Sequence, residues 1–286
     1  MTLTTLFWAS NFVLGRAFSP ELTPITLAFV RWAAALTLLL PFAIPTIWKH
    51  RTLIRENWMS LFILGGLSVA GFNTLAYIGL QSTTAVNGTL MQSTMPIMIL
   101  CLSALFLREM ATLKQWLGVI VSLSGVLLLI SQAKLELLLT LEFNTGDLWI
   151  ITAMLVWGVY SIGLRWKPAG LTQFEFLQIT LIVGVIILYP LALWEQQSAP
   201  AIQWSNELYM LIAYLAVFPS ILAYLFWNYG VEKLGAQTSG LFIHLVPLWG
   251  MILSVTLLGE QVQAFHLAGM ALIFVGIYLA VIADRA

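Results

Sequence analysis

Charged residues are scarce in this chain, and their scarcity excludes an ordinary soluble globular protein. Only 8% of its 286 residues are Asp, Glu, Lys or Arg, whereas a typical soluble domain has about 25%. Hydrophobic residues make up 60% of the chain, and the mean hydropathy is +0.95. Twelve basic residues balance twelve acidic ones, so the sequence offers no basic surface for nucleic acid. The composition predicts an integral membrane protein with no nucleic-acid partner.

Other absences narrow the chemistry. Cysteine is limited to Cys101, in an apolar run, so neither a disulfide framework nor a cysteine-based metal site is expected. The sequence contains no G-x-x-x-x-G-K-[ST] motif, which disfavours coupling to ATP. It also lacks an H-E-x-x-H motif and an Asp-rich motif, so we expect neither an intramembrane zinc protease nor a Mg²⁺-dependent lipid enzyme. We expect no enzyme activity and no cofactor.

Long apolar runs predict ten membrane-spanning helices, because a bilayer core needs about 20 apolar residues per helix. The run 57–107 contains no Asp, Glu, Lys or Arg and is long enough for two spans, divided by GLQSTT at 79–84. No basic segment precedes the first apolar stretch, so we expect no cleaved signal peptide. The first span begins at Met1, whereas its counterpart is preceded by NTGD at 144–147, which leaves open whether the natural start lies upstream. The predicted spans are 1–18, 22–47, 57–79, 85–107, 112–131, 147–165, 172–193, 207–229, 236–258 and 263–283.

Some polar and small residues in these spans are explained by helix structure alone. Thr112 with Gln115 and Thr172 with Glu175 have the spacing of capping boxes. Four glycines, seven apart in pairs, predict close packing between helices: Gly118, Gly125, Gly269 and Gly276.

Basic residues in short loops predict the orientation, because such residues favour the cytoplasm. With both termini in the cytoplasm, nine basic residues lie inside and only Arg16 and Lys134 lie outside. The nine are Lys49, Arg51, Arg55, Arg108, Lys114, Arg165, Lys167, Lys233 and Arg285.

The chain also resembles itself. Pro, Glu, Gly and Gly recur at spacings of 13, 9 and 7 in both halves, beginning at Pro96 and at Pro247, 151 residues apart. At an offset of 149, Trp8 and Arg16 align with Trp157 and Arg165. Each half holds five spans, an odd number, so the halves are predicted to have opposite orientations. We expect a first repeat over 1–131, a loop over 132–146 and a second repeat over 147–286, the architecture of many secondary transporters.

Several stretches resemble one known family. FWASNFVLGRAF at 7–18, LAFVRWAAALTLLLP at 27–41, and a proline followed thirteen residues later by LRE at 107–109 or LGE at 258–260 resemble the drug/metabolite transporter superfamily. Within it, the ten-helix EamA-type exporters are the most similar. The resemblance implies two EamA repeats, a bacterial inner-membrane location, and ATP-independent export of amino acids or related small metabolites. Proton or substrate counter-flow, export of drugs or lipid-linked metabolites, and a non-catalytic multi-span membrane protein are left as alternatives.

Polar and aromatic side chains near the middle of spans are the candidate substrate-binding residues, because a polar group in hydrocarbon is costly and usually faces a cavity or the interior of the bundle. In the first helix Trp8 and Asn11 share a face, as Trp157 and Tyr160 do in the sixth. These residues have a second interpretation, in which Trp8 anchors the helix at the interface and Asn11 bonds a neighbouring helix.

The third and eighth helices present a second paired face. Asn73 and Tyr77 lie four residues apart, and so do Tyr224 and Asn228, with Trp227 beside them. The order of amide and phenol is exchanged between the halves. These five residues are predicted to surround a small amphipathic solute.

Arg31 lies nine residues beyond Leu22, or roughly 13 Å into the membrane at 1.5 Å per residue. It either binds a substrate carboxylate as a fork or pairs with neutral polar groups as a fixed strut. Its counterpart in the second half is Thr180, so only one repeat carries the charge.

Pro96 and Pro247 are predicted in mid-span, where each ring would remove a backbone hydrogen bond and kink the helix as a hinge. Gln92 and His244 lie beside these kinks and complete the set of candidate binding residues. His244 could carry a proton near neutral pH, although a buried histidine is more often simply hydrogen-bonded.

Overall fold

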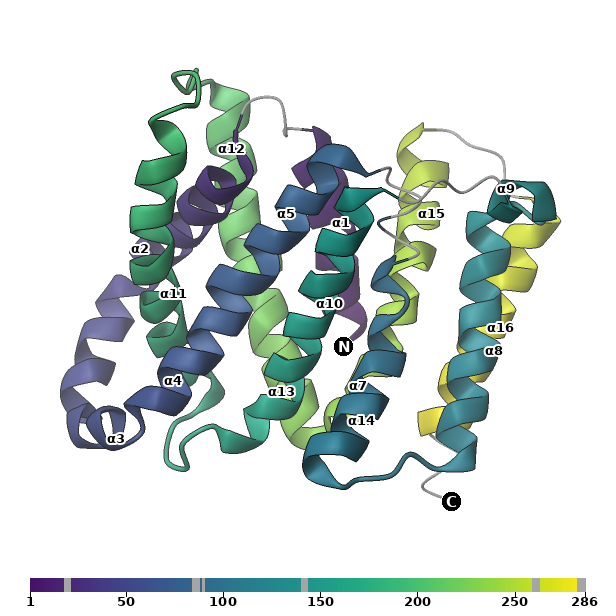
Figure 1. Cartoon of the computed structure of the whole chain (residues 1–286), viewed down its shortest axis with the longest axis horizontal. Helices are drawn as coiled ribbons and strands as arrows, with labels where there is room; N and C mark the ends of the chain where they lie inside the picture. The colour runs from purple at the N-terminus through teal and green to yellow at the C-terminus, as the bar shows by residue number, and fades with distance from the viewer. Residues whose placement is uncertain (18–21, 84–87, 89–90, 140–143, 259–262, 282–286) are drawn as a thin grey trace.

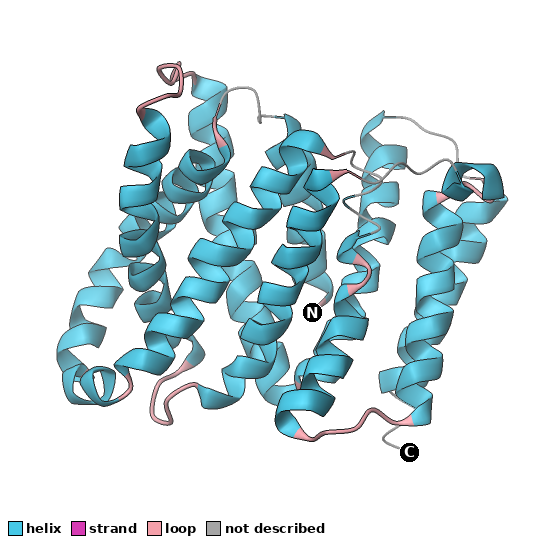
Figure 2. Cartoon of the chain, viewed as in Figure 1, coloured by secondary structure: helices cyan, strands magenta, loops and turns pink. Residues whose placement is uncertain are grey.

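The computed structural model describes residues 1–17, 22–83, 88, 91–139, 144–258 and 263–281. In these residues every regular element is a helix (Figure 2). Six helical stretches are long and apolar enough to cross a bilayer, and two shorter ones, 95–107 and 264–280, are also apolar. The six are 24–49, 58–82, 113–130, 145–166, 173–196 and 206–234. The prediction of an all-helical membrane protein is confirmed for this part of the chain.

The described helices of the first half lie mostly within the predicted spans, and two short helices, α3 and α9, lie in connections between them. They are α1 (Thr2–Ala17), α2 (Pro24–Lys49), α3 (Arg51–Glu56), α4 (Trp58–Gly65), η1 (Gly66–Phe72), α5 (Asn73–Ser82), α7 (Met95–Leu102), η2 (Ser103–Leu107), α8 (Leu113–Ile130) and α9 (Leu135–Leu139).

The second half is also entirely helical in the residues that the structure describes. Its helices are α10 (Thr145–Gly163), η3 (Leu164–Trp166), α11 (Gln173–Gln196), α12 (Asn206–Leu215), η4 (Ala216–Leu222), α13 (Ala223–Leu234), α14 (Ala236–Leu241), η5 (Phe242–His244), α15 (Leu245–Leu258) and α16 (Ala264–Val281). The elements η1, η2 and η4 are π-helical, a wide turn that often occurs at functional sites.

Both predicted capping boxes are confirmed. Thr112 Oγ1 accepts from the backbone N–H of Gln115, whose side chain accepts from the N–H of Thr112. Thr172 and Glu175 make the same reciprocal pair at the start of α11. These two polar pairs therefore begin helices.

Helices of one half pack along helices of the other. α2 packs along α11, and α8 packs along α16. In both pairs the chain runs in opposite directions. In Figure 1, α8 rises from the lower edge while α16 descends to end near the C-terminus. The start of α2 contacts the end of α11 through Ile25 and Glu195, and the end of α2 contacts the start of α11 through Lys49 and Glu175. The predicted glycine contact is confirmed, because a Cβ on Gly118 would lie 2.5 Å from the carbonyl oxygen of Gly276.

The structure places both mid-span prolines near the start of a helical element, directly after a local irregularity. Pro96 is the second residue of α7, directly after a turn at 93–94, and Pro247 is the third residue of α15, directly after η5. The first N–H groups of a helix have no partner one turn earlier, so Pro96, which begins α7 after a turn, costs little there. Around Pro247 the helical elements α14, η5 and α15 follow one another without a gap from 236 to 258. A kink or hinge at either proline stays a prediction.

Candidate functional site

A buried arginine joins helices of both halves. Arg31 of α2 is 0% exposed. Its Nη1 donates to Asn11 Oδ1 at 3.0 Å, to Asn73 Oδ1 at 2.9 Å and to Tyr77 OH at 2.8 Å. Its Nε donates to Ser220 Oγ at 2.6 Å. The structure thus brings four of the predicted residues into one network, which we call the Arg31 network, together with a serine that the sequence did not single out.

Tyr224 extends the Arg31 network across the halves. Asn73 Nδ2 donates to Tyr224 OH at 2.9 Å, and Tyr224 OH donates to the carbonyl oxygen of Ser68 at 2.7 Å. Ser68 and Ser220 lie in η1 and η4, the π-helical turns of the two halves. The network is therefore held by two wide turns, one from each half.

Arg31 is bonded to neutral partners. Among the described residues its guanidinium makes no ion pair, and its Cζ lies 4.9 Å from the centre of the Trp32 ring. A buried charge is costly unless dipoles or an opposite charge compensate it. Here amide and hydroxyl oxygens and an aromatic face provide that compensation, which favours the interpretation of Arg31 as a strut over that of a carboxylate fork.

Aromatic rings fill the space beside the Arg31 network. The ring centres of Trp8 and Trp157 are 5.0 Å apart, those of Trp8 and Trp227 are 5.1 Å apart, and those of Trp157 and Tyr224 are 5.1 Å apart. Phe72 lies 4.7 Å from Trp157. All five side chains are buried. This aromatic cluster packs α1, η1, α10 and α13 together, so buried rings occupy the space between these described helices.

A second phenol–amide pair lies on the second half. Tyr160 OH donates to Asn228 Oδ1 at 2.7 Å, just as Tyr77 OH donates to Asn11 Oδ1 at 2.8 Å in the first half. Both members of the second pair are buried. The Nδ2 of Asn228, however, has no hydrogen-bond partner.

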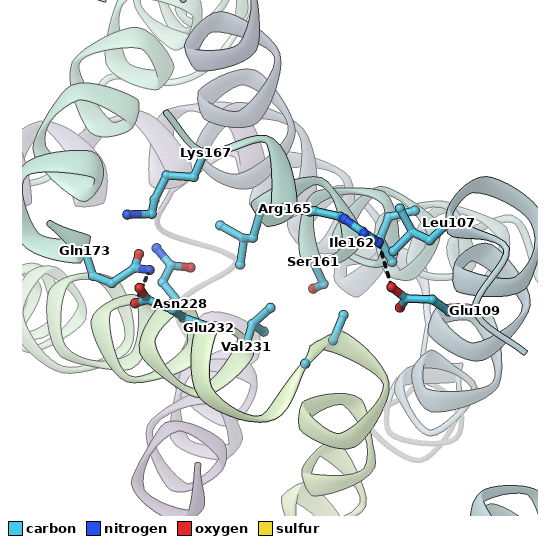
Figure 3. A pocket seen from close by; sticks show the side chains of 13 residues that line it. Leu107, Glu109, Ser161, Ile162, Arg165, Lys167, Gln173, Asn228, Val231 and Glu232 are labelled. Carbon is cyan, nitrogen blue, oxygen red and sulfur yellow. Dashed lines mark hydrogen bonds and ion pairs between the residues drawn. The ribbon is translucent and has the colours of Figure 1, made fainter. Parts of the chain in front are cut away.

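A pocket of about 310 Å³ reaches the second pair from one face of the molecule (Figure 3). Asn228 is the one predicted binding residue that lines it. The lining residues are Leu107, Glu109, Ser161, Ile162, Leu164, Arg165, Lys167, Gln173, Asn228, Val231, Glu232, Gly235 and Ala236. They come from the ends of η2, α10 and α13, from η3, from the starts of α11 and α14, and from the connections beside them, at the lower edge of Figure 1.

Two polar pairs line this pocket. Arg165 Nη1 donates to Glu109 Oε1 at 2.6 Å, and Gln173 Nε2 donates to Glu232 Oε2 at 2.7 Å; Figure 3 marks both contacts. Sequence reasoning missed these residues as site candidates because they are polar and lie at helix ends, where solvated loops and caps explain them. Their common location at the ends of predicted spans on one face was the available signal.

The Arg31 network lies toward the opposite face. Gln173, at the start of α11, lines the pocket, whereas Glu195, near the end of α11, accepts from the N–H groups of Ile25 and Thr26 at the start of α2. Arg31 therefore follows the end of α2 that is remote from the pocket. In the described part of the chain a pocket opens toward one face, whereas the Arg31 network and the aromatic cluster are buried.

His244 and Gln92 lie elsewhere. His244 Nδ1 is 2.6 Å from Ser122 Oγ, and its Nε2 is 3.0 Å from the carbonyl oxygen of Ser93. Gln92 is buried next to Ser93, in the short helical segment before α7. His244 thus joins α8 to the break before α7, in keeping with a hydrogen-bonded histidine.

Known proteins resemble this chain over nearly its full length. The model of the EamA-like transporter family matches residues 1–131 and 144–282. "Uncharacterized transporter YyaM" of Bacillus subtilis (strain 168) is 31% identical over 96% of this chain and 90% of its own length. "Probable terminal-alkyne amino-acid exporter" of Streptantibioticus cattleyicolor is 24% identical over 98% of this chain and 91% of its own length.

A solved crystal structure shares the fold. It superposes with a TM-score of 0.77 over 99% of this chain and 96% of that chain, at 17% sequence identity.

Proposed function

Since the chain belongs to the EamA-like transporter family, a family of membrane transporters, we propose that it exports amino acids or related small metabolites by alternating access. In this proposal it has no enzyme activity and uses no ATP. A gradient of substrate, or counter-flow of a proton or a second substrate, drives transport.

One observation carries the proposal: the pocket opens toward one face of the molecule, whereas the described side chains beyond it are buried and packed together. Asn228 marks the inner end of the pocket, and Trp157, Trp227 and Tyr224 close the space beyond it with buried, mutually packed rings. Alternating access requires a state of this kind, in which a site near the midplane is reached from one side only.

The second conformation would come from inverted repeats. In our proposal ten helices form a first repeat over 1–131 and a second over 147–286, joined by 132–146. The antiparallel pairs α2–α11 and α8–α16 support this arrangement. The π-helical turns η1 and η4 occupy corresponding places in the two halves, which also supports it. Exchanging the conformations of the halves would close the pocket and open the opposite face.

In the predicted orientation the pocket opens toward the cytoplasm, the side from which an exporter takes up its solute. Arg165 and Lys167 line it, and both belong to the basic loops predicted to be cytoplasmic. The solute would then enter from the cytoplasm of a bacterial cell with the protein in its inner membrane.

Amino acids are the proposed substrate class because one relative is named as an amino-acid exporter and because the pocket is lined by charged, amide and apolar side chains. The alternatives are a drug or lipid-linked metabolite, or a multi-span protein that transports nothing.

Proteoliposomes test the proposal. Vesicles are loaded with labelled amino acids, and efflux is measured against vesicles without protein and against vesicles with added ATP. Saturable, ATP-independent efflux of at least one amino acid is the expected result. Absence of saturable flux for every amino acid would reject the amino-acid version, and absence of flux for every solute class would reject transport.

A further inference from the structure

Two buried polar atoms of opposite kind lack partners in the same pocket. Asn228 Nδ2, a donor, and Gln173 Oε1, an acceptor, both belong to residues that line the pocket, and neither makes a hydrogen bond. A buried polar group without a partner is costly. A ligand that offers an acceptor and a donor close together would remove both costs.

The chemistry of the neighbours fixes the orientation of each amide. Gln173 must turn its NH₂ toward the acceptor-only carboxylate of Glu232, so its oxygen points away from that contact. Tyr160 donates to the oxygen of Asn228, so the NH₂ of Asn228 is left for another partner. Tyr160 thus acts as a positioning residue for the amide.

The corresponding place in the first half is already occupied by a charge. There, the phenol–amide pair of Tyr77 and Asn11 receives hydrogen bonds from Arg31. At the position of Arg31 the second half has Thr180, whose hydroxyl bonds to its own helix. The second pair is therefore left without a cation from the protein, and its Asn228 lines the pocket.

The pocket also carries one unpaired charge of each sign. Lys167 Nζ donates to the carbonyl oxygen of Leu171, and Glu232 accepts from neutral Gln173. Neither makes an ion pair with a described residue, whereas Arg165 and Glu109 neutralise each other. Figure 3 shows Lys167, Gln173, Asn228 and Glu232 grouped on one side of the pocket.

We infer that this group of four residues binds the head group of a zwitterionic α-amino acid, an inference that rests on the proposed function and specifies its site. The ligand carboxylate accepts from Asn228 Nδ2 and faces Lys167. The ligand ammonium donates to Gln173 Oε1 and faces Glu232. The ligand side chain lies toward the apolar lining, which includes Leu107, Ile162 and Val231.

Other solute classes satisfy fewer of these groups. A simple anion leaves the Gln173 oxygen unpaired and meets the negative charge of Glu232. A simple cation leaves the Asn228 donor unpaired and meets Lys167. A neutral polyol can pair both amides but leaves both charges without a counter-ion, and electrostatic complementarity is what separates such ligands.

Binding to the purified full-length chain tests the inference with three probes. The twenty proteinogenic L-amino acids are screened singly for thermal stabilisation, and the best binder is compared with its amide and its N-acetyl derivative. The first derivative lacks the carboxylate and the second lacks the ammonium. We expect each to bind at least about tenfold more weakly, the usual effect of losing a charge-assisted hydrogen bond. Equal binding of either derivative would overturn the inference.

Two variants test which charge of the protein faces which charge of the ligand. Lys167→Met is expected to weaken binding of the amino acid about tenfold and to leave binding of the amide derivative, which has no carboxylate, unchanged. Glu232→Gln is expected to weaken binding of the amino acid to a similar extent and to leave binding of the N-acetyl derivative, which has no ammonium, unchanged. Lys233→Met and Glu207→Gln are the controls, since neither residue lines the pocket. A variant that weakens all three probes equally would contradict direct recognition.

The positioning role of Tyr160 has its own readout. Tyr160→Phe leaves the Asn228 amide free to rotate, so the ratio of amino-acid to amide affinity should fall toward one. Unchanged selectivity in a folded Tyr160→Phe protein would refute the role.

Transport measurements distinguish a failure of this inference from a failure of the proposed function. Saturable transport of another solute class, with no binding of any amino acid, would refute the head-group site and leave transport in place. Amino-acid binding with the expected selectivity but no flux would refute transport and leave the site in place.

Discussion

Arg31 in α2 donates from Nε to Ser220 Oγ in η4 at 2.6 Å, and Ser220 Oγ in turn donates to the carbonyl oxygen of Leu215 at 2.6 Å. Through Nη1 the same guanidinium is bonded to Asn11, Asn73 and Tyr77 of the first half. One buried charge therefore connects the first half to a π-helical turn of the second. Any movement of η4 relative to α2 must break or exchange a charge-assisted hydrogen bond.

We predict that Arg31→Lys impairs transport although it keeps the charge. A lysine ammonium is a compact point charge and cannot reproduce the fork that reaches Ser220 and the first-half residues together. We expect efflux to fall at least about tenfold and the unfolding free energy to fall by about 2 kcal/mol, since a buried hydrogen-bonded charge loses some of its partners. Proteoliposome flux and thermal unfolding in detergent measure the two effects.

The matched control is Arg55→Lys, because Arg55 is exposed. Wild-type flux and stability are expected for that variant. If Arg31→Lys behaves in the same way, the Arg31 network is not what holds the centre closed.

The close contact between α8 and α16 predicts sensitivity to a single methyl group. A Cβ on Gly118 would lie 2.5 Å from both the Gly276 carbonyl oxygen and the Ala280 Cβ. The helices must separate to accept Gly118→Ala, so we expect a loss of about 1–3 kcal/mol in unfolding free energy, as for other overpacked sites. Unfolding in mixed detergent measures it.

Gly250→Ala controls for helix propensity, since a Cβ there meets nothing within 4 Å. It should be neutral or slightly stabilising. Equal stabilities for the two alanine variants would show that α8 and α16 do not pack as closely as described.

Much of the fold could be predicted from the sequence because a membrane imposes simple rules. The length of the apolar runs predicted where helices lie, and the Thr112 and Thr172 capping boxes mark two of their starts. Prolines were harder to interpret. The sequence cannot distinguish a kink within a helix from a break that restarts it: Pro96 follows a turn at 93–94, whereas Pro247 follows the 3-10 turn η5 inside a continuous helical stretch.

The candidate site was predictable in part because a membrane also restricts where polar residues occur. Polar residues in hydrocarbon are few, so Arg31, Asn11, Asn73 and Tyr77 could be selected, and the structure brings them together. Partners at helix ends could not be selected, because a residue such as Gln173 is indistinguishable from a solvated one by composition. Only three-dimensional placement shows that its oxygen is buried and unpaired.

Glu195 is predicted to stabilise the end of α2 that is remote from the pocket. Its Oε2 accepts from the N–H and hydroxyl of Thr26, and its Oε1 accepts from the N–H of Ile25. A carboxylate at a helix N-terminus is favourable. Glu195→Gln replaces one acceptor with a donor that faces N–H groups, so we expect a loss of about 1–2 kcal/mol in unfolding free energy. The exposed Glu56 serves as the comparison, and Glu56→Gln should leave the melting temperature unchanged; equal melting temperatures for both variants would argue against this cap.

Reagent access tests which side of the membrane the pocket faces. In a Cys101→Ser background, single cysteines are introduced by Val231→Cys in the pocket lining, by Ala169→Cys on the exposed loop after α10, and by Ser198→Cys on the exposed turn after α11. We expect a membrane-impermeant maleimide to label the Ser198→Cys protein in intact cells and the other two only after permeabilisation, because the basic loops are predicted to be cytoplasmic. An amino acid that binds the pocket should slow labelling of the Val231→Cys protein and leave labelling of the Ala169→Cys protein unchanged.

Labelling of the Ala169→Cys and Ser198→Cys proteins from the same side would contradict the proposed topology, because α11 would then not cross the membrane between them. Labelling of the Val231→Cys protein from outside in intact cells would show that the pocket opens away from the cytoplasm, and loading for export would then need the other conformation.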